Sequence, residues 1–150
     1  MKLLTFVLML LCNFCYSQKL INDLLDSDKD NVTKMMSKQL PNYKIYKPSY
    51  DSSGVNRIEF SLVKDSIPDS GILAYLFYFE NPTSVKCTGI RIIWHDEEVF
   101  KKYFNMLTQQ SQKTAANLWY DEKSNVTLAA FYYVKENYSF YFIDIQRPIK

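Results

Sequence analysis

The sequence VTLAAFYYVKENYSFYFIDI occupies residues 126–145 and holds two apolar segments on either side of Glu136 and Asn137. Valine, isoleucine, tyrosine and phenylalanine dominate both segments, 126–134 and 138–145, and these residue types favour β-strands. A short polar connection between two such segments is typical of a β-hairpin. We therefore predict an antiparallel hairpin with a two-residue turn at Glu136 and Asn137.

A two-residue turn also fixes the register of this hairpin. Four cross-strand pairs follow, two on each face: Phe131–Phe142 with Tyr133–Phe140, and Ala130–Ile143 with Tyr132–Tyr141. Both faces are apolar, and we expect the phenylalanine-rich face to pack into the core. The face with Tyr132, Tyr141 and Ile143 is expected to stay partly open and to contact a partner protein or an identical subunit, because tyrosine is common at interface centres. The alternative is that polar side chains from loops cover this face.

Upstream segments also have the alternating or continuous apolar pattern of strands: 43–47, 55–63, 72–80, 85–94 and 118–120. Segment 72–80 is apolar on both faces, so we expect it to be central in the sheet. Turn-forming residues separate the strands at 51–54, 68–71, 81–83 and 121–125. Most connections are therefore short, which favours an antiparallel sheet.

Apolar residues recur at spacings of three and four in two segments, 19–40 and 96–109, and this spacing predicts helices. The pattern weakens near Ser27, which is a good N-cap residue. The first segment is thus either two short helices or one bent helix, and it ends at Pro41. Acidic residues begin the second segment and lysines follow, as the helix dipole favours. Residues 110–115 are expected to form a polar linker.

The order of these elements predicts an α+β fold. An N-terminal helix or helix pair precedes an antiparallel sheet of about six to seven strands, with one inserted helix packed on it. The chain has 150 residues, of which 47% are hydrophobic and 23% charged, and this composition suits one globular domain. We place that single α+β domain at residues 18–150.

The first residues are predicted to be a signal peptide. A basic residue is followed by the apolar run at 3–12, which is too short for a membrane span of about 20 residues. The small residues Cys15 and Ser17 precede a cleavage site between Ser17 and Gln18, so the signal peptide would cover 1–17. No second apolar segment approaches membrane length, and we expect no stable membrane span after cleavage.

The expected destination is the periplasm or the extracellular medium. A lipoprotein would need small residues before its lipidated cysteine, but Leu11 precedes Cys12 and Phe14 precedes Cys15. The abundance of Lys, Asn, Tyr, Ile and Phe is typical of a bacterium with an AT-rich genome. After cleavage only Cys87 remains, so the exported chain has no internal disulfide.

Composition argues against two classes of ligand. The formal net charge is only +2, whereas nucleic-acid binding depends on clustered positive charge. The chain has three glycines in total, too few in any one place for a glycine-rich phosphate loop. Ser66 is a candidate modification site, because Asp65-Ser66-Ile67 resembles a bacterial O-glycosylation motif and lies in an expected loop.

No metal, cofactor or catalytic residue is predicted. The acidic run at 26–30 lacks the glycine and the final acid of a calcium loop. His95 is the one histidine, and a usual zinc site needs more ligands. Cys87 and His95 lie on one expected strand, about 26 Å apart at the usual rise per residue, and therefore do not form a nucleophile–base pair.

Residues 27–41, with Val32 and Met36 on one helix face, resemble the helical entry of small bacterial envelope modules of the BamE/SmpA and β-lactamase-inhibitor-protein type. Those modules begin with short helices and continue into an antiparallel sheet. Where they usually have Leu-Gly-x-Pro, this chain has Lys38-Gln39-Leu40-Pro41. The whole layout also resembles many small exported bacterial proteins of unknown function.

Together these features favour an exported soluble domain that works as a non-catalytic protein-binding or accessory module of the bacterial envelope. Its expected partner is another envelope protein or a second copy of itself. The alternative is a small hydrolase with a carboxylate-based site. The two differ in what the fold must present: an exposed apolar or aromatic patch for binding, or convergent polar groups in a pocket for catalysis.

The signal-peptide prediction is tested by the mass of the protein isolated from its native host. We expect a chain that begins at Gln18 and is found in the periplasm or the medium. A cytoplasmic product that still carries Lys2 would contradict the prediction.

Overall fold

The computed structural model describes residues 21–46, 56–62, 71–79 and 86–148. Several expected features lie outside these residues: the signal peptide at 1–17, Ser66, the turns at 51–54 and 81–83, and most of the turn at 68–71. None of the helices in the described residues has the length and apolar character needed to cross a membrane.

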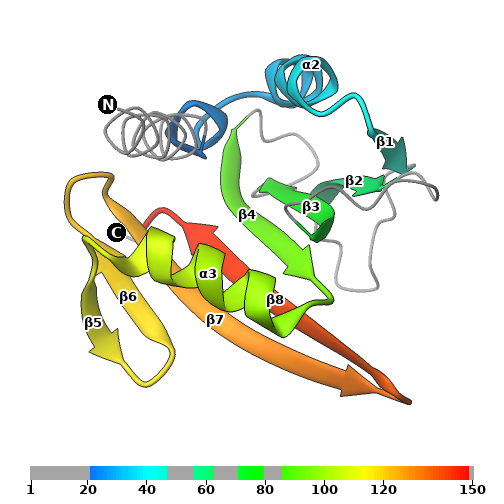
Figure 1. The fold of residues 1–150 in the computed structure, drawn as a ribbon. Helices are drawn as coiled ribbons and strands as arrows, with labels where there is room; N and C mark the ends of the chain where they lie inside the picture. Colours follow the sequence, from blue (N-terminus) through cyan, green and yellow to red (C-terminus); the bar gives the residue numbers. More distant parts are fainter. Residues whose placement is uncertain (1–20, 47–55, 63–70, 80–85, 149–150) are drawn as a thin grey trace, which may run out of the picture.

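In the described residues eight strands form one sheet in the order β1-β2-β3-β4-β8-β7-β6-β5, and all neighbours are antiparallel (Figure 1). The strands are β1 Tyr43–Tyr46, β2 Asn56–Leu62, β3 Ile72–Phe79, β4 Cys87–Trp94, β5 Gln112–Ala115, β6 Leu118–Asp121, β7 Val126–Lys135 and β8 Tyr138–Gln146. Helix α2 spans Lys29–Gln39 and α3 spans Glu97–Thr108. The α+β class is confirmed, with more strands than the expected six to seven.

The additional strand is β5, which replaces most of the linker expected at 110–115. All four of its residues, Gln112–Ala115, are exposed. The strand pairs with β6 at the edge of the sheet, where its backbone is satisfied on one side and its side chains stay in water. Its sequence therefore needs no alternation of apolar and polar residues. Because that alternation is what predicts a half-buried strand, β5 was not predicted.

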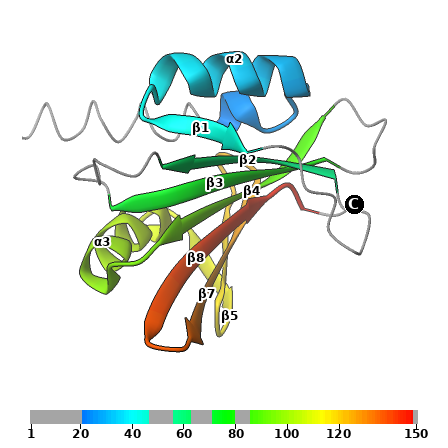
Figure 2. The ribbon, with the colours of Figure 1, turned by 90° about the vertical axis from the view of Figure 1, so that its right-hand side faces the viewer.

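The core lies on one face of the sheet. A row of facing residues crosses five strands: Ile58, Phe77, Ile90, Ile145 and Leu128. Each of them is at most 8% exposed. Val32 and Met36 of α2 belong to the same core cluster, and the apolar side chains of α3 pack against it. Figures 1 and 2 show α2 near β1 and α3 near β8, so each helix covers a different part of this face.

The N-terminal helical segment is broken, as one of the two alternatives predicted. Residues 21–24 are helical and α2 begins at Lys29. The N-cap is Asp28, whose carboxylate accepts the backbone N–H of Asn31 at 2.7 Å. The expected cap Ser27 instead donates its hydroxyl to the carbonyl of Asp23. That prediction was wrong by one residue, because a carboxylate and a hydroxyl compete for the same role here.

The break in the helical segment is tied to the sheet by backbone hydrogen bonds. Asp26, at a φ of 70°, donates its N–H to the carbonyl of Cys87, and Cys87 donates to the carbonyl of Ser27. Arg147 donates to the carboxylate of Asp26 and to the carbonyl of Ser124. These bonds join the break at Asp26 and Ser27 to Cys87, the first residue of β4, and to Arg147, which follows β8.

The register predicted for the β7–β8 hairpin is confirmed. The four predicted pairs are present: Ala130–Ile143, Phe131–Phe142, Tyr132–Tyr141 and Tyr133–Phe140. Lys135 pairs with Tyr138, which leaves Glu136 and Asn137 as the turn. Glu136 has a φ of 57°, the left-handed conformation that short hairpin turns require.

The predicted core face of this hairpin was wrong. Ile143 is fully buried beside Ile92 of β4, whereas Phe131 and Tyr133 are 46% and 55% exposed. The face of Phe142 also carries the charged Asp144, whereas Ile143 shares its face with Ile145 and continues the apolar row of Ile90 and Ile92 on β4. The charged residue therefore marks the outer face, despite its phenylalanines.

The opposite face of the sheet is marked by an ion pair between Arg91 of β4 and Asp144 of β8. Two hydrogen bonds of 2.6 and 2.7 Å join the guanidinium to the carboxylate. The rings of Tyr78 and Phe142 lie within 6 Å of the guanidinium carbon, at 5.8 and 5.5 Å. The bonds to Asp144 raise the pKa of Arg91. A charged pair at this position identifies the face that the helices do not cover.

The corrected face assignment predicts unequal costs for two substitutions on the same side of the hairpin. Ile143→Ala should lower the free energy of unfolding by about 2–5 kcal/mol, because it leaves a cavity in the core. Tyr132→Ala, at a site that is 76% exposed, should change the free energy by no more than about 0.5 kcal/mol. Urea unfolding of both variants measures the difference, and equal costs would contradict the assignment.

Candidate functional site

An open groove of about 410 Å³ lies between α3 and strands β6, β7 and β8. Its volume is within the range of sites that receive small ligands or side chains of a partner, about 300–1,000 Å³. Most of its lining is aromatic: Phe100, Phe104, Trp119, Phe131, Tyr132 and Tyr141. We call it the aromatic groove. Its polar lining residues are Glu97, Lys101 and Asn117.

The wall on the α3 side is built by two phenylalanines one helical turn apart. Phe100 and Phe104 are spaced i and i+4, so they lie on one face of the helix and stack at 5.8 Å. Phe100 also stacks on Tyr141 of β8 at 5.2 Å, and Phe104 packs edge-to-face with Trp119 of β6 at 4.7 Å. These ring contacts hold the helix at a distance that leaves the groove open beside them.

Polar groups gather at the Glu97 end of the groove. Tyr141 donates its hydroxyl to Glu97 at 3.1 Å, and Lys101 donates to Glu97 and Glu98, each at 3.0 Å. The hydrogen bond from Lys101 lowers the pKa of Glu97, with a further contribution from Tyr141. Loss of hydration, followed by the bond to Glu97, raises the pKa of Tyr141. Glu97 is therefore an ionised hydrogen-bond acceptor at neutral pH.

The three residues proposed from sequence as a partner surface have different positions. Tyr132 is 76% exposed at the groove, and Tyr141 is half-buried within it. Ile143 has no exposed surface, so its assignment to a partner surface was wrong. The two tyrosines and the isoleucine do share a face, but Ile143 belongs to the buried cluster against which the side chains of α3 pack.

Sequence reasoning missed the contribution of α3 to the groove. Its apolar spacing was used only to predict a helix that packs on the sheet, and no residue of α3 is fully buried. Phe100, Phe104 and Leu107 have the ordinary spacing of a stripe that faces a core, so the sequence held no signal that part of this stripe would line a groove. Trp119 was assigned to a short strand, and nothing local indicated that it would meet Phe104.

Cys87 and His95 lie at opposite ends of β4. Cys87 is fully buried and its thiol donates to the carbonyl of Gly89 at 3.4 Å. Burial raises the pKa of this thiol to about 12, so it carries no nucleophilic thiolate at neutral pH. His95 is exposed just after Trp94. Within the described ranges, no three residues among His, Cys, Asp and Glu are grouped closely enough to hold a metal ion.

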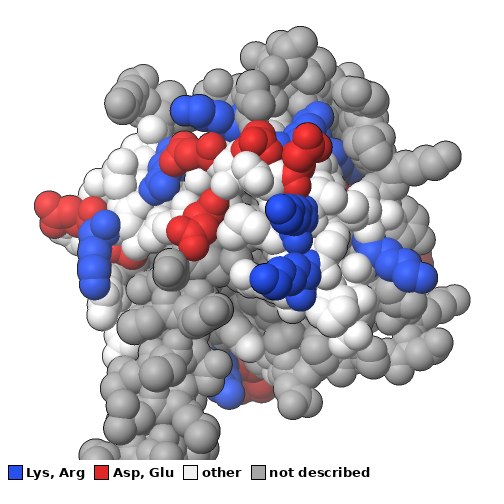
Figure 3. All heavy atoms as spheres, turned by 90° about the horizontal axis from the view of Figure 1, so that it is seen from above, with Lys and Arg blue, Asp and Glu red and all other residues white. Residues whose placement is uncertain are grey.

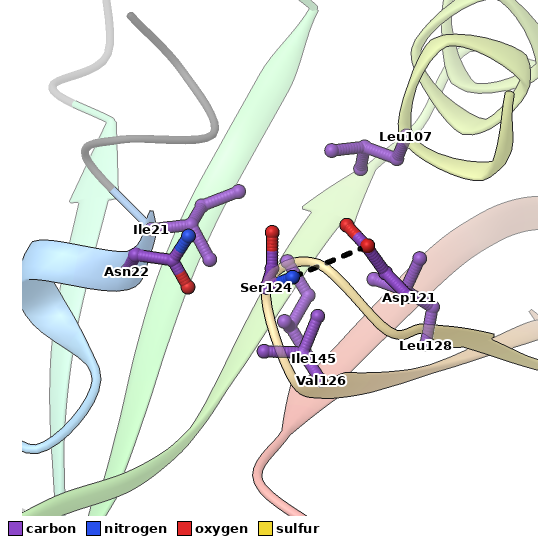
Figure 4. Close-up of a pocket in the computed structure, with 8 residues that line it drawn as sticks. All are labelled: Ile21, Asn22, Leu107, Asp121, Ser124, Val126, Leu128 and Ile145. Atoms are coloured by element: carbon purple, nitrogen blue, oxygen red, sulfur yellow. Dashed lines mark hydrogen bonds between the residues drawn. The ribbon is translucent and has the colours of Figure 1, made fainter. Parts of the chain in front are cut away.

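A second, much smaller cavity lies between the helical entry, α3 and the β6–β7 turn (Figure 4). Its volume is about 20 Å³, roughly what one water molecule needs and far below the size of an organic ligand. Asp121 lies at its wall and accepts the backbone N–H groups of Lys123 and Ser124, which orders the turn. This cavity therefore has a structural role.

The charged side chains do not define a competing site on the α2 side of the molecule. Figure 3 shows Lys and Arg mixed with Asp and Glu there among the described residues. A mixed surface gives little long-range steering of a charged partner. The aromatic groove is therefore the strongest candidate for a functional site.

Comparison of the chain with protein-family models, with curated proteins and with solved structures finds no match.

The buried thiol leads to a direct prediction. At pH 8 iodoacetamide should leave Cys87 unmodified in the native protein and should alkylate it after denaturation, as mass spectrometry of its peptide will show. The sign of the pH effect follows from the raised pKa. Between pH 9 and 12 the unfolded thiol loses its proton while the folded one keeps it, so stability falls over this range. Cys87→Ala should reduce this loss, and rapid native alkylation would contradict the buried position.

Proposed function

We propose that this protein is an exported, non-catalytic binding module of the bacterial envelope, and that its aromatic groove receives apolar side chains of a partner protein. The observation that carries the proposal is the position of Tyr132, which is 76% exposed beside a groove lined by other aromatic side chains. The export of the chain and the resemblance of residues 27–41 to envelope modules are parts of the same proposal.

The groove has the composition of an interface centre. Tyrosine, tryptophan and phenylalanine are enriched there because a large, rigid ring buries much area at a small entropic cost. Anchor residues of this kind typically account for about 2 kcal/mol or more of binding each. Phe100, Phe104 and Trp119 hold one another in place, so the groove is preorganised before a partner enters.

The polar end of the groove supports binding better than hydrolysis. A carboxyl group that acts as a general acid needs a raised pKa, whereas the hydrogen bond from Lys101 lowers the pKa of Glu97. Glu97 is also the one carboxylate among the described groove residues, so a pair of carboxylates is not assembled there. Glu97 and Lys101 instead offer an acceptor and donors to the backbone or side chains of a bound segment.

Site-specific photo-crosslinking in the native host tests the proposal. A benzoylphenylalanine at position 101, which lines the groove, should capture a partner protein. The same probe at the neighbouring exposed position 102, which does not line it, is the matched control. Capture at both positions alike, or at neither, would contradict a partner in the groove.

The captured partner then permits a measurement of affinity. With purified proteins, Tyr132→Ser should weaken binding at least about tenfold, since it removes an anchor ring worth more than 1.4 kcal/mol. Ile45→Ser is the control, because Ile45 is also exposed, at 44%, but lies on β1 at the other end of the sheet. Equal dissociation constants for the two variants would show that the groove does not bind the partner.

A further inference from the structure

The end of the β7–β8 hairpin extends beyond its neighbouring strands. Strand β6 pairs with β7 only as far as Ala129, and β4 pairs with β8 only from Tyr141 onward. Residues 131–140, which we call the arm, have no further strand beside them in the described part of the chain. Figure 1 shows the arm projecting away from the rest of the sheet.

The arm exposes large apolar side chains on both of its faces: Phe131 46%, Tyr132 76%, Tyr133 55%, Val134 56% and Tyr138 69%. A two-stranded ribbon of this kind is only marginally stable in water by itself. A long apolar edge also offers unpaired backbone groups to another strand. The outer edges of the sheet carry lysines, Lys44 on β1 and Lys113 on β5, whereas β7 carries no charge from Phe131 to Val134.

The direction of the backbone groups on the free edge follows from one hydrogen bond. Ala130 donates its N–H to the carbonyl of Asn117, on the side of β7 that faces β6. Backbone groups alternate in direction along a strand, so Tyr132 and Val134 point their N–H and C=O groups to the same side. On that side the pairing with β6 has already ended at Ala129. The groups of Phe131 and Tyr133 point toward β8.

We propose that two copies of this chain pair antiparallel through this free edge of β7, about a two-fold axis at Tyr133. In this register Tyr132 of each copy faces Val134 of the other, and the outward groups of both residues form four hydrogen bonds. Tyr133 faces its own equivalent as a non-hydrogen-bonded pair. The two eight-stranded sheets become one continuous sheet.

The geometry of the edge favours a second copy over an unrelated strand. The free segment is 131–135, bounded by Asn117 at one end and by the Glu136 turn at the other, and a two-fold copy supplies a strand of the same length. The outward groups are symmetric about Tyr133, as an isologous interface requires. Strand β7 is apolar on both faces of the arm, so a pairing strand buries this surface best when it is apolar on both faces too. The β7 strand of a second copy has this property.

This pairing goes beyond the proposed function and fails independently of it. Val134 of the second copy would lie beside Tyr132 and lengthen the wall of the aromatic groove. Capture by the probe at position 101 reports on the groove, whereas pairing depends on the edge of the arm.

Disulfide trapping tests the register. In a chain with Cys12 and Cys15 replaced by serine, Tyr133→Cys should form a covalent dimer in more than half of the molecules when diamide is added as oxidant. The Cα atoms of a non-hydrogen-bonded antiparallel pair are about 4.5 Å apart, within the range of a disulfide. Tyr138→Cys is the control, because Tyr138 is exposed on the same face, at 69% against 55% for Tyr133, but lies on β8. Equal trapping of both variants, or trapping of neither, would overturn the pairing.

Light scattering tests the reversible association. The unmodified chain should have the mass of a dimer at 100 μM, and Val134→Pro should weaken association at least tenfold, because it removes an outward N–H. Val134→Thr keeps that N–H and should associate like the unmodified chain. Circular dichroism verifies that the variants are folded, and Val134→Lys provides a second disruption by charge. A folded, unmodified chain that stays monomeric at 100 μM would overturn the proposal, even if the groove binds another protein.

Discussion

The aromatic contact of Phe100 with Trp94 and Tyr141 determines the arrangement of the rest of the molecule. Phe100 lies on α3 and reaches β4 through Trp94 at 5.8 Å and β8 through Tyr141 at 5.2 Å. It therefore fixes the helix across the two strands that join the two halves of the sheet. The face beneath α3 becomes core, and the opposite face keeps the Arg91–Asp144 pair. The groove beside α3 and the arm beyond it are what this single helix does not cover.

Helix α3 covers only part of the β7–β8 hairpin, because a helix of twelve residues is shorter than the strands on which it lies. Helix α3 is about 18 Å long at 1.5 Å per residue, whereas β7 has ten residues and extends over about 33 Å. Burial along the hairpin follows this difference. Val126 and Leu128 are 4% and 3% exposed, and the exposed fraction rises to 76% at Tyr132. The apolar surface of the arm is thus a consequence of geometry, and its aromatic composition makes it suited to recognition.

The sequence predicted the hairpin, its turn and its register, because a two-residue connection leaves few alternatives for residues near it. It predicted both helices for the same reason, since their apolar spacing is local. The core face of the hairpin was predicted wrongly because the phenylalanines were given more weight than Asp144. Phe142 shares its face with Asp144, whose ion pair with Arg91 marks the outer side of the sheet. The polar strand β5 and the contact of Trp119 with Phe104 depend on tertiary packing, which leaves no local pattern.

The apolar edge of the arm is an interface between two copies of the chain in this proposal, and amide hydrogen exchange of β7 measured against protein concentration tests that pairing. The amides of Phe131 and Tyr133 should be protected at every concentration, because they face β8. The amides of Tyr132 and Val134 should exchange freely in dilute solution and become protected as the concentration rises. Fast exchange of Tyr132 and Val134 at all concentrations, or protection that is independent of concentration, would contradict the pairing of two copies through β7.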